Sequence, residues 1–330
     1  MTRDETAGFD FTLRTRLVFG PGSLARLGEL ARELGFRRPL LVADPGLVAT
    51  GHVARARQAL ESAGLAVETF HAFDSNPDSA MVAAGAVVAR ASGADSLVGL
   101  GGGSSLDCAK GIAFVVTNGG DMSEYRGYAK ARTPLLPMIG VPTTAGTGSE
   151  AQSYALISDA ATHRKMACGD PTAAFRIALL DPELTVSQPA SVTAVAGYDA
   201  LSHAVESSML GAAHACANPL TAHHGTTHGI AVGMMLASVT RWNAPVASGG
   251  YAELLAASGH DAGDSPAHTL AKRLDALAER GGLPRRLAAI GIDEAELPEL
   301  AAEAAQEWTG TFNPRPFDAA AALELYRSVA

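Results

Sequence analysis

The chain has 330 residues, 47% of them apolar, with 25 basic and 34 acidic residues and a formal net charge of −9 at pH 7. This length favours two domains, and the apolar content excludes an intrinsically disordered chain. The negative charge and the lack of a long basic run speak against nucleic acid as a partner, and no 18-residue apolar run predicts a membrane span.

Two further features predict the compartment. The amino-terminal segment MTRDETAGFDFTLRTR lacks the apolar run of a signal peptide. The cysteines Cys108, Cys168 and Cys216 are odd in number, widely spaced and outside any CxxC pair, which fits a reducing environment. We therefore expect a soluble, cytoplasmic protein.

Apolar runs alternate with helical stretches through the first half of the chain. Strands are expected within 37–44, 65–73, 96–103 and 135–144, and helices near 51–63, near 78–92 and after the glycines at 101–103. This alternation predicts βαβ units around a mostly parallel sheet. Strand signals stop after DPELTVSQPASV, and the rest is rich in Ala and Leu at helical spacing, with breaks expected at 218–220, 258–266 and 312–316. We place an α/β domain at 1–184 and an all-helical domain at 185–330.

A glycine-rich turn, SLVGLGGGSSLDCAK, joins a predicted strand to a predicted helix. Ser104 could cap this helix, with Asp107 as its capping-box partner. Glycines let a backbone approach a pyrophosphate, and the helix amides and dipole offset its charge, although a plain βα turn remains the alternative. A second polar turn, VPTTAGTGSE, follows the next strand and would lie beside the first, which favours a dinucleotide.

Asp44 ends the strand RRPLLVAD. A carboxylate there can accept hydrogen bonds from the adenosine ribose hydroxyls and repels a 2′-phosphate, which favours NAD over NADP. The alternative is that Asp44 only initiates the turn before Pro45 and Gly46.

Five of the ten histidines lie between residues 203 and 228, and Asp199 precedes the first by four positions. Helical spacing places Asp199 and His203 on one face, so that both can point at one ion. His214 and His228 could complete a set of three nitrogens and one oxygen, which suits Zn²⁺ or Fe²⁺ better than Ca²⁺ or Mg²⁺. The alternative is a group of surface or core histidines.

Four motifs, GGGSSLDCAK, VPTTAGTGSE, GYDALSHAVE and HACANPLTAHHGTTHG, closely resemble, in this order, those of the iron-containing (group III) alcohol dehydrogenase family. The resemblance covers nearly the whole chain. It implies a dehydroquinate synthase-like architecture, with a Rossmann-like α/β domain, an all-α domain, and NAD(P) and a divalent metal between them. It assigns the metal to Asp199, His203, His214 and His228. It assigns cofactor contacts to Gly102, Gly103, Ser104, Asp107, Thr143, Thr144 and Lys165, with Asp44 selecting NAD. Without the resemblance, the alternative interpretation of Lys165 is a solvated surface lysine.

The chain departs from the family at two places. The family often has a histidine where this chain has Asn218, and an amide cannot act as a general base, so His223 or His224 takes that role or the proton leaves through water. The family also has about fifty more residues between the second and third ligands, whereas this chain has ten, from Ala204 to Ala213. One continuous helix would hold His203 and His214 about 16 Å apart, so the helix must break and reverse, and Gly211 is the only breaker in this interval.

These observations favour an NAD-dependent alcohol dehydrogenase, or aldehyde or ketone reductase, that uses Fe²⁺ or Zn²⁺. One alternative is a maleylacetate reductase-like enzyme with a dispensable metal. The other is a catalytically silent deletion variant that acts as a binding protein. The expected partner is a small alcohol or aldehyde, and the resemblance implies a homodimer.

Overall fold

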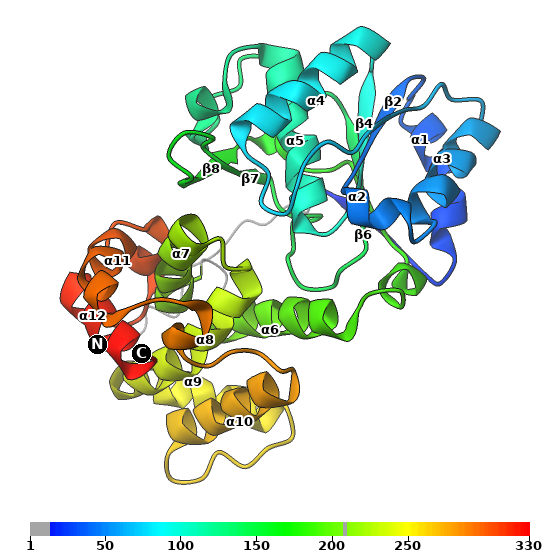
Figure 1. Ribbon diagram of the computed structural model, residues 1–330. Coiled ribbons are helices and arrows are strands. Elements are labelled where there is room, and N and C mark those ends of the chain that lie inside the picture. The colour runs from blue at the N-terminus through cyan, green and yellow to red at the C-terminus, as the bar shows by residue number, and fades with distance from the viewer. Residues whose placement is uncertain (1–13, 207–209) are drawn as a thin grey trace, which may run out of the picture. The chain divides into compact units, whose positions relative to one another are not determined.

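The computed structural model describes residues 14–206 and 210–330, which form two compact units (Figure 1). The first unit runs from the start of the described chain to Thr143 and includes Gly148–Ala160 and Met166–Val186. The second contains Thr144–Thr147, Ala161–Lys165 and the described residues from Ser187 to Ala330. The prediction that the chain has no signal peptide concerns residues 1–16, and most of these lie outside the described residues. Among the described residues, none of the helices combines the length and the apolar character that a membrane span requires.

The first unit contains a six-stranded sheet in which the paired neighbours run parallel. Its strands, in spatial order, are β1 (Arg16–Phe19), β9 (Ile177–Leu180), β6 (Met138–Pro142), β4 (Ser96–Gly101), β2 (Pro39–Ala43) and β3 (Glu68–Phe70). The four strands expected from the sequence, at β2, β3, β4 and β6, are confirmed. The order places β3 and β4 on opposite sides of β2, so the chain changes direction across the sheet between β2 and β4.

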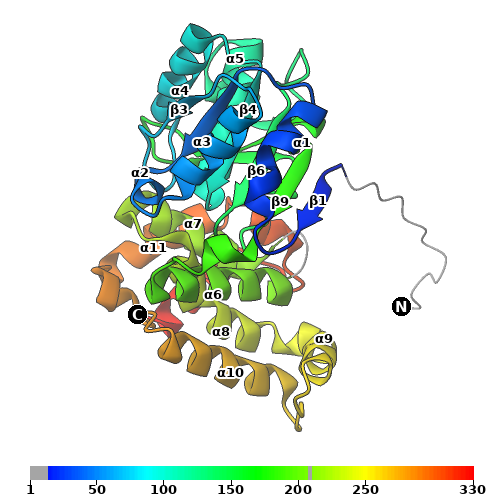
Figure 2. The same cartoon turned by 90° about the vertical axis from the view of Figure 1, so that its right-hand side faces the viewer.

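Helices cover both faces of this sheet, as Figure 2 shows. Side chains of a strand alternate between the faces, so Leu40 and Val42 pack with α4 (Ser79–Ser92) and α5 (Gly103–Asn118). Leu41 and Ala43 pack with α1 (Leu27–Glu33) and α3 (His52–Ser62) on the other face. A strand buried on both sides needs apolar residues at every position, which explains the continuous apolar runs of the sequence.

A second, three-stranded sheet was not predicted from the sequence. It pairs β5 (Gly127–Tyr128), β8 (Lys165–Gly169) and β7 (Tyr154–Ser158) in that order. In β7 only every second side chain is buried, and β5 has two residues, so neither gives the strong apolar signal of the main sheet.

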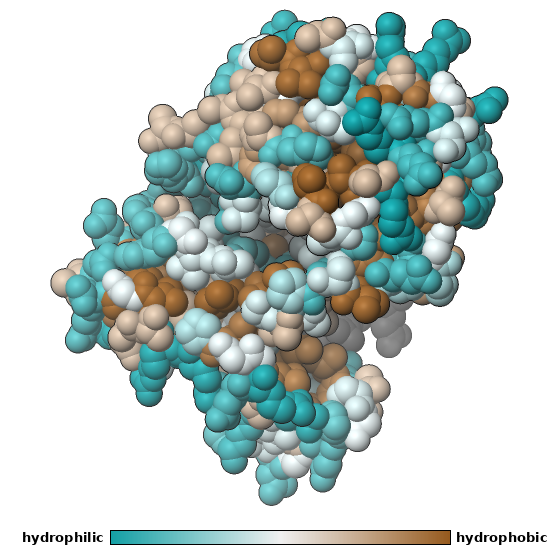
Figure 3. All heavy atoms as spheres, turned by 45° about the vertical axis from the view of Figure 1, so that its right-hand side comes forward, coloured by the Kyte–Doolittle hydropathy of each residue, from teal (hydrophilic) through white to brown (hydrophobic). Residues whose placement is uncertain are grey.

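On the face drawn in Figure 3, hydrophobic residues reach the surface in separate patches among hydrophilic ones.

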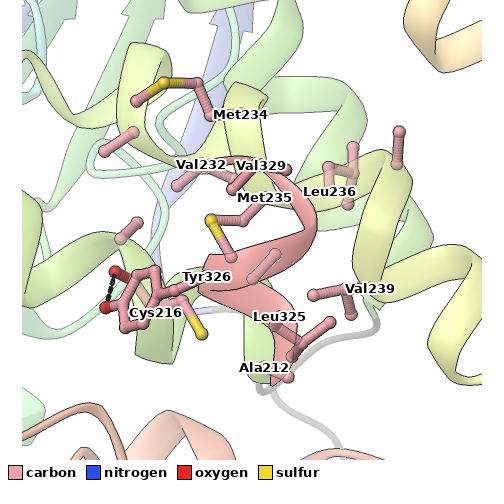
Figure 4. Packing of buried hydrophobic residues seen from close by; sticks show 14 of the residues in the cluster. Ala212, Cys216, Val232, Met234, Met235, Leu236, Val239, Leu325, Tyr326 and Val329 are labelled. Carbon is pink, nitrogen blue, oxygen red and sulfur yellow. Dashed lines mark hydrogen bonds between the residues drawn. The ribbon is translucent and has the colours of Figure 1, made fainter. Parts of the chain in front are cut away.

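The second unit is helical, as predicted. Its helices are α6 (Ala190–Glu206), α7 (Ala212–His224), α8 (His228–Trp242), α9 (Ala244–Ala257), α10 (Pro266–Arg280), α11 (Leu297–Ala304) and α12 (Ala319–Ser328). Its core is drawn in Figure 4, where Tyr326 of α12 reaches α7. The Tyr326 hydroxyl is buried and donates to the carbonyl oxygen of Cys216 at 2.6 Å, so this large polar side chain is satisfied inside the core.

The three breaks predicted in this unit have different outcomes. Those at 258–266 and 312–316 are confirmed, because α9 ends before the first and α12 begins after the second. The break at 218–220 is wrong, because α7 continues through Pro219. An interior proline costs a helix about 3 kcal/mol. Cys216 and Leu220, on either side of it, are fully buried in the core, and this packing holds the helix together.

Candidate metal centre and cofactor turns

Three helices of the second unit bring four predicted ligands together. Asp199 and His203 lie one turn apart on α6, His214 lies in the first turn of α7, and His228 begins α8. The Oδ1 atom of Asp199 lies 3.7 Å from Nε2 of His203, 3.8 Å from Nε2 of His214 and 4.0 Å from Nε2 of His228. Three imidazole nitrogens thus surround one carboxylate oxygen.

The short interval does not prevent this arrangement. Helix α6 ends at Glu206 and α7 begins at Ala212, so the predicted break is confirmed, and the rings of His203 and His214 lie 5.0 Å apart. Residues 207–209 lie outside the described part of the chain. After them, Leu210 has a positive φ of 68° and Gly211 is extended.

Two polar atoms at the centre of this cluster fit a cation. Oδ1 of Asp199 and Nε2 of His214 are buried and have no hydrogen-bond partner among the described residues. A buried polar atom left unpaired costs about 1–3 kcal/mol, so such a pair marks a place for a ligand. Asp199, His203 and His214 each offer a ligand atom within 4.8 Å of the others, a spread that one ion can bridge. The donor set of nitrogens and one oxygen suits Zn²⁺ or Fe²⁺.

The electrostatics of the cluster agree with this interpretation. Burial lowers the pKa of His203, and it lowers the pKa of His228 well below the usual value, with Lys165 adding to the effect at His228. Both imidazoles are therefore neutral at neutral pH, which is the form that binds metal. Burial also raises the pKa of Asp199. A cation at this point would favour its carboxylate form.

His223, His224 and Asn218 each lie beside a glutamate that was not predicted as a site residue. Nε2 of His223 lies 2.8 Å from Oε2 of Glu303, and Nε2 of His224 lies 3.1 Å from Oε2 of Glu296. The Asn218 amide donates to Oε2 of Glu307 at 2.8 Å. These three residues do not belong to the ligand cluster of Asp199, His203 and His214.

Glu206 is a site residue that the sequence reasoning missed. Its Oε2 forms a hydrogen bond with Nδ1 of His214, and its Oε1 accepts from the backbone N–H of Ala213 at 2.6 Å. The signal that could have found it is the spacing His203-x-x-Glu206, which places a carboxylate on the same face of α6 as a ligand.

The glycine turn of the first unit begins its helix earlier than predicted. Helix α5 starts at Gly103, and its N-cap is Gly102, which has no side chain to cap it. The prediction that Ser104 caps the helix with Asp107 is therefore wrong, and the Ser104 hydroxyl accepts instead from the N–H of Asn76 at 3.1 Å. A glycine cap leaves the first-turn amides without a side-chain acceptor, as an anion site requires.

The other predicted cofactor residues of this unit follow β2 and β6, the two strands that flank β4. Asp44 follows β2 and accepts from the Ser105 hydroxyl at 3.3 Å, while it also precedes the short helix α2 (Pro45–Val48). Both interpretations of Asp44 thus agree with its position. The N–H of Thr143, after β6, donates to the carbonyl of Gly101, the last residue of β4, at 3.0 Å, so the two polar turns are neighbours.

Thr144 and Lys165 belong to the second unit. The Thr144 hydroxyl is buried. The charge of Lys165 opposes the rise in the pKa of Asp199 and adds to the fall in the pKa of His228, and its contact with the cofactor stays a prediction.

Both halves of the chain match known protein families. Residues 14–182 match the family described as "Iron-containing alcohol dehydrogenase", and residues 204–330 match "Fe-containing alcohol dehydrogenase family, C-terminal". The second match begins next to His203 and includes the other two histidines of the cluster.

Curated proteins that are similar to this chain are also named as alcohol dehydrogenases. The chain is 38% identical over 197 residues to "NAD-dependent methanol dehydrogenase" of Bacillus methanolicus and 39% over 204 residues to "Alcohol dehydrogenase 4" of Schizosaccharomyces pombe. These alignments span about half of each relative, 52% and 47%. It is 28% identical to "1,3-propanediol dehydrogenase" of Citrobacter freundii over 97% of this chain and 98% of that protein. That alignment spans 383 positions, so the relative carries residues that this chain lacks.

Solved structures share the fold. A structure titled "Crystal structure analysis of 1,3-propanediol oxidoreductase" matches 98% of this chain and 100% of its own, with a TM-score of 0.92 and 26% identity. "Alcohol dehydrogenase from Oenococcus oeni" matches with a TM-score of 0.93, 98% of this chain and 100% of its own, at 24% identity.

Proposed function

Because the chain belongs to the iron-containing alcohol dehydrogenase family, we propose that it is an NAD-dependent alcohol dehydrogenase, or aldehyde or ketone reductase, assisted by a divalent metal. The observation that carries the proposal is the convergence of three imidazole nitrogens on the buried, unpaired Oδ1 of Asp199. The first relatives match over only half of their length, so the reaction is inferred from this site together with the family.

Each site residue has a proposed role. Asp199, His203, His214 and His228 hold Fe²⁺ or Zn²⁺. When bound, the metal supplies Lewis acidity to the substrate oxygen, and NAD, when bound, exchanges hydride with the carbinol carbon. The turn at Gly102 and Gly103 receives the pyrophosphate, with further contacts from Ser104, Asp107, Thr143, Thr144 and Lys165. The proton passes to His223 or His224, or leaves through water, and Asn218 takes no proton because an amide is not a base.

The remaining features of the proposal follow from the family and the composition. We assign cofactor binding to residues 1–184 and metal binding to 185–330. We also propose a cytoplasmic homodimer that acts on a small alcohol or aldehyde and binds neither nucleic acid nor membranes. A maleylacetate reductase-like enzyme without need of a metal, and a silent binding protein, are the alternatives that an experiment must exclude.

The test is elemental analysis of the purified protein combined with turnover of NAD in a screen of primary and secondary alcohols. We expect about one equivalent of iron or zinc per chain, and we expect a chelator to abolish turnover and added metal to restore it. Turnover that persists in the metal-free protein would favour the maleylacetate reductase-like alternative. A protein that binds NAD but turns over no substrate with metal bound would favour the silent one.

Replacing Asp44 with alanine tests the choice of NAD. The carboxylate repels the 2′-phosphate of NADP, and a charge pair near a protein surface interacts by a few kcal/mol. We therefore expect the ratio of kcat/KM for NAD to that for NADP to fall about 10- to 100-fold in this variant. Asp264→Ala, at an exposed position of the second unit, is the control. An unchanged ratio would leave Asp44 with its role before α2 alone.

A further inference from the structure

Glu206 joins the end of α6 to the start of α7 by two hydrogen bonds. It is the last residue of α6, and its side chain is only 3% exposed. Its two oxygens have separate partners, the N–H of Ala213 and the Nδ1 of His214. Both partners lie in the first turn of α7.

The partner at Nδ1 decides which nitrogen of His214 is free. A neutral imidazole carries one proton, and a carboxylate beside Nδ1 holds that proton there as a hydrogen-bond donor. Nε2 then has its lone pair available. That atom is buried, unpaired and 3.8 Å from Oδ1 of Asp199, so the lone pair belongs to the ligand cluster.

The second oxygen fixes the start of α7. The N-cap Gly211 has no side chain, and the first N–H groups of a helix need outside acceptors. Glu206 supplies one of them at Ala213, and Asn313 accepts from the N–H of Ala212 at 3.3 Å. The backbone packs closely here, because a Cβ at Gly211 would lie 3.0 Å from Oε1 of Glu206 and 3.2 Å from Oδ1 of Asn313.

We propose that Glu206 is a positioning residue of the metal centre, which holds His214 in the tautomer that binds metal through Nε2 and secures the start of α7 across the short interval. The inference rests on the proposed function in taking His214 as a metal ligand. Glu206 itself does not touch the metal in this assignment.

Glu206→Gln is the variant that separates the two hydrogen bonds. Glutamine has nearly the same shape but only one acceptor oxygen, so it can accept a hydrogen bond from Ala213 or from His214 but not from both. With its oxygen on Ala213, its NH₂ group faces Nδ1 of His214 and favours the tautomer with the proton on Nε2. That tautomer has no lone pair at Nε2 to bind metal, so we expect the metal dissociation constant to rise about 10- to 100-fold.

The dissociation constant is measured by competition with a chromophoric chelator, with circular dichroism to establish that helix content is unchanged. Glu303→Gln is the matched control, because it makes the same change at the partly exposed pair with His223. A Glu206→Gln protein that binds metal within twofold of the wild type would overturn the proposal. So would an equal loss of affinity in the control.

A second measurement does not depend on metal. In the metal-free wild type at pH 8, two-dimensional ¹⁵N–¹H spectra of the imidazoles, with the His214 signals assigned by their loss in His214→Gln, should show the proton of His214 on Nδ1. A proton on Nε2 would overturn the inference whether or not Glu206→Gln folds. A wild type with this tautomer that nevertheless binds no iron, zinc or cobalt would refute the proposed function and leave the orienting contact in place.

Discussion

Replacing His214 with alanine should remove the metal from the protein and lower kcat/KM for NAD-dependent alcohol oxidation by about 1,000-fold or more. His214 is the most buried imidazole of the cluster, with a side chain 2% exposed, and its Nε2 has no other partner among the described residues. A Lewis acid at the substrate oxygen contributes several kcal/mol to transition-state stabilisation, and each 1.36 kcal/mol is a factor of ten in rate.

The variant is compared with the wild type by elemental analysis and by steady-state kinetics at saturating NAD. His260→Ala is the control, because this histidine lies in the second unit, outside the cluster, where its ring pairs with Arg273. We expect the control to retain its metal and its rate. A His214→Ala protein that keeps one equivalent of metal and a rate within threefold of the wild type would place the metal elsewhere.

Much of the metal centre could be predicted because its first half is local. Asp199 and His203 are one helical turn apart, so their meeting follows from helix geometry alone. His214 and His228 come from other helices, so they were suggested only by the number of histidines in a short segment and by the resemblance to the family. The sequence also required a break before His214, because a straight helix would separate the two histidines.

Glu206 could not be found in the same way. Its role depends on two contacts across the break, with Ala213 and His214, and these form only when α7 packs against α6. The spacing from His203 to Glu206 places the carboxylate on the same face of α6 as a ligand, but no periodicity identifies its partners beyond the break. The short interval predicted a break between the two helices, but it did not indicate which side chain connects them.

The two wrong local predictions share a physical cause. Ser104 is a good capping residue and Pro219 is a good helix breaker, but both preferences are small beside tertiary packing. Asn76 takes the Ser104 hydroxyl as acceptor, and the buried core around α7 holds Pro219 in a helix. Local signals were reliable in the main sheet, where burial on both faces and strand propensity point to the same structure.

Replacing Lys110 with methionine should lower the free energy of unfolding of the protein by about 3–5 kcal/mol. Lys110 lies in α5 and is fully buried. Its ammonium group donates to the carbonyl oxygens of Ser149, Gln152 and Tyr154 at 2.7, 2.9 and 2.8 Å. Burial lowers its pKa to about 8, against the nearby charge of Asp107, so the group still carries its charge at pH 7.

Three N–H donors thus meet three carbonyls of one chain segment, and methionine has a similar length but no donor. Removing the charge leaves three acceptors without this partner, and at least that of Ser149 is buried, where each lost bond costs about 1–3 kcal/mol. The segment continues the turn VPTTAGTGSE, so a loosened loop should also weaken NAD binding if that turn contacts the cofactor.

Urea unfolding at pH 7, followed by circular dichroism, measures the stability, and fluorescence titration with NADH measures the binding. Lys272→Met, at an exposed position of α10, is the control and should change stability by less than about 0.5 kcal/mol. If the variant lost stability but bound NADH as the wild type does, Lys110 would stabilise the fold without affecting cofactor binding. A Lys110→Met protein as stable as the control would mean that the three carbonyls find water, and the loop would then hold its shape without the buried charge.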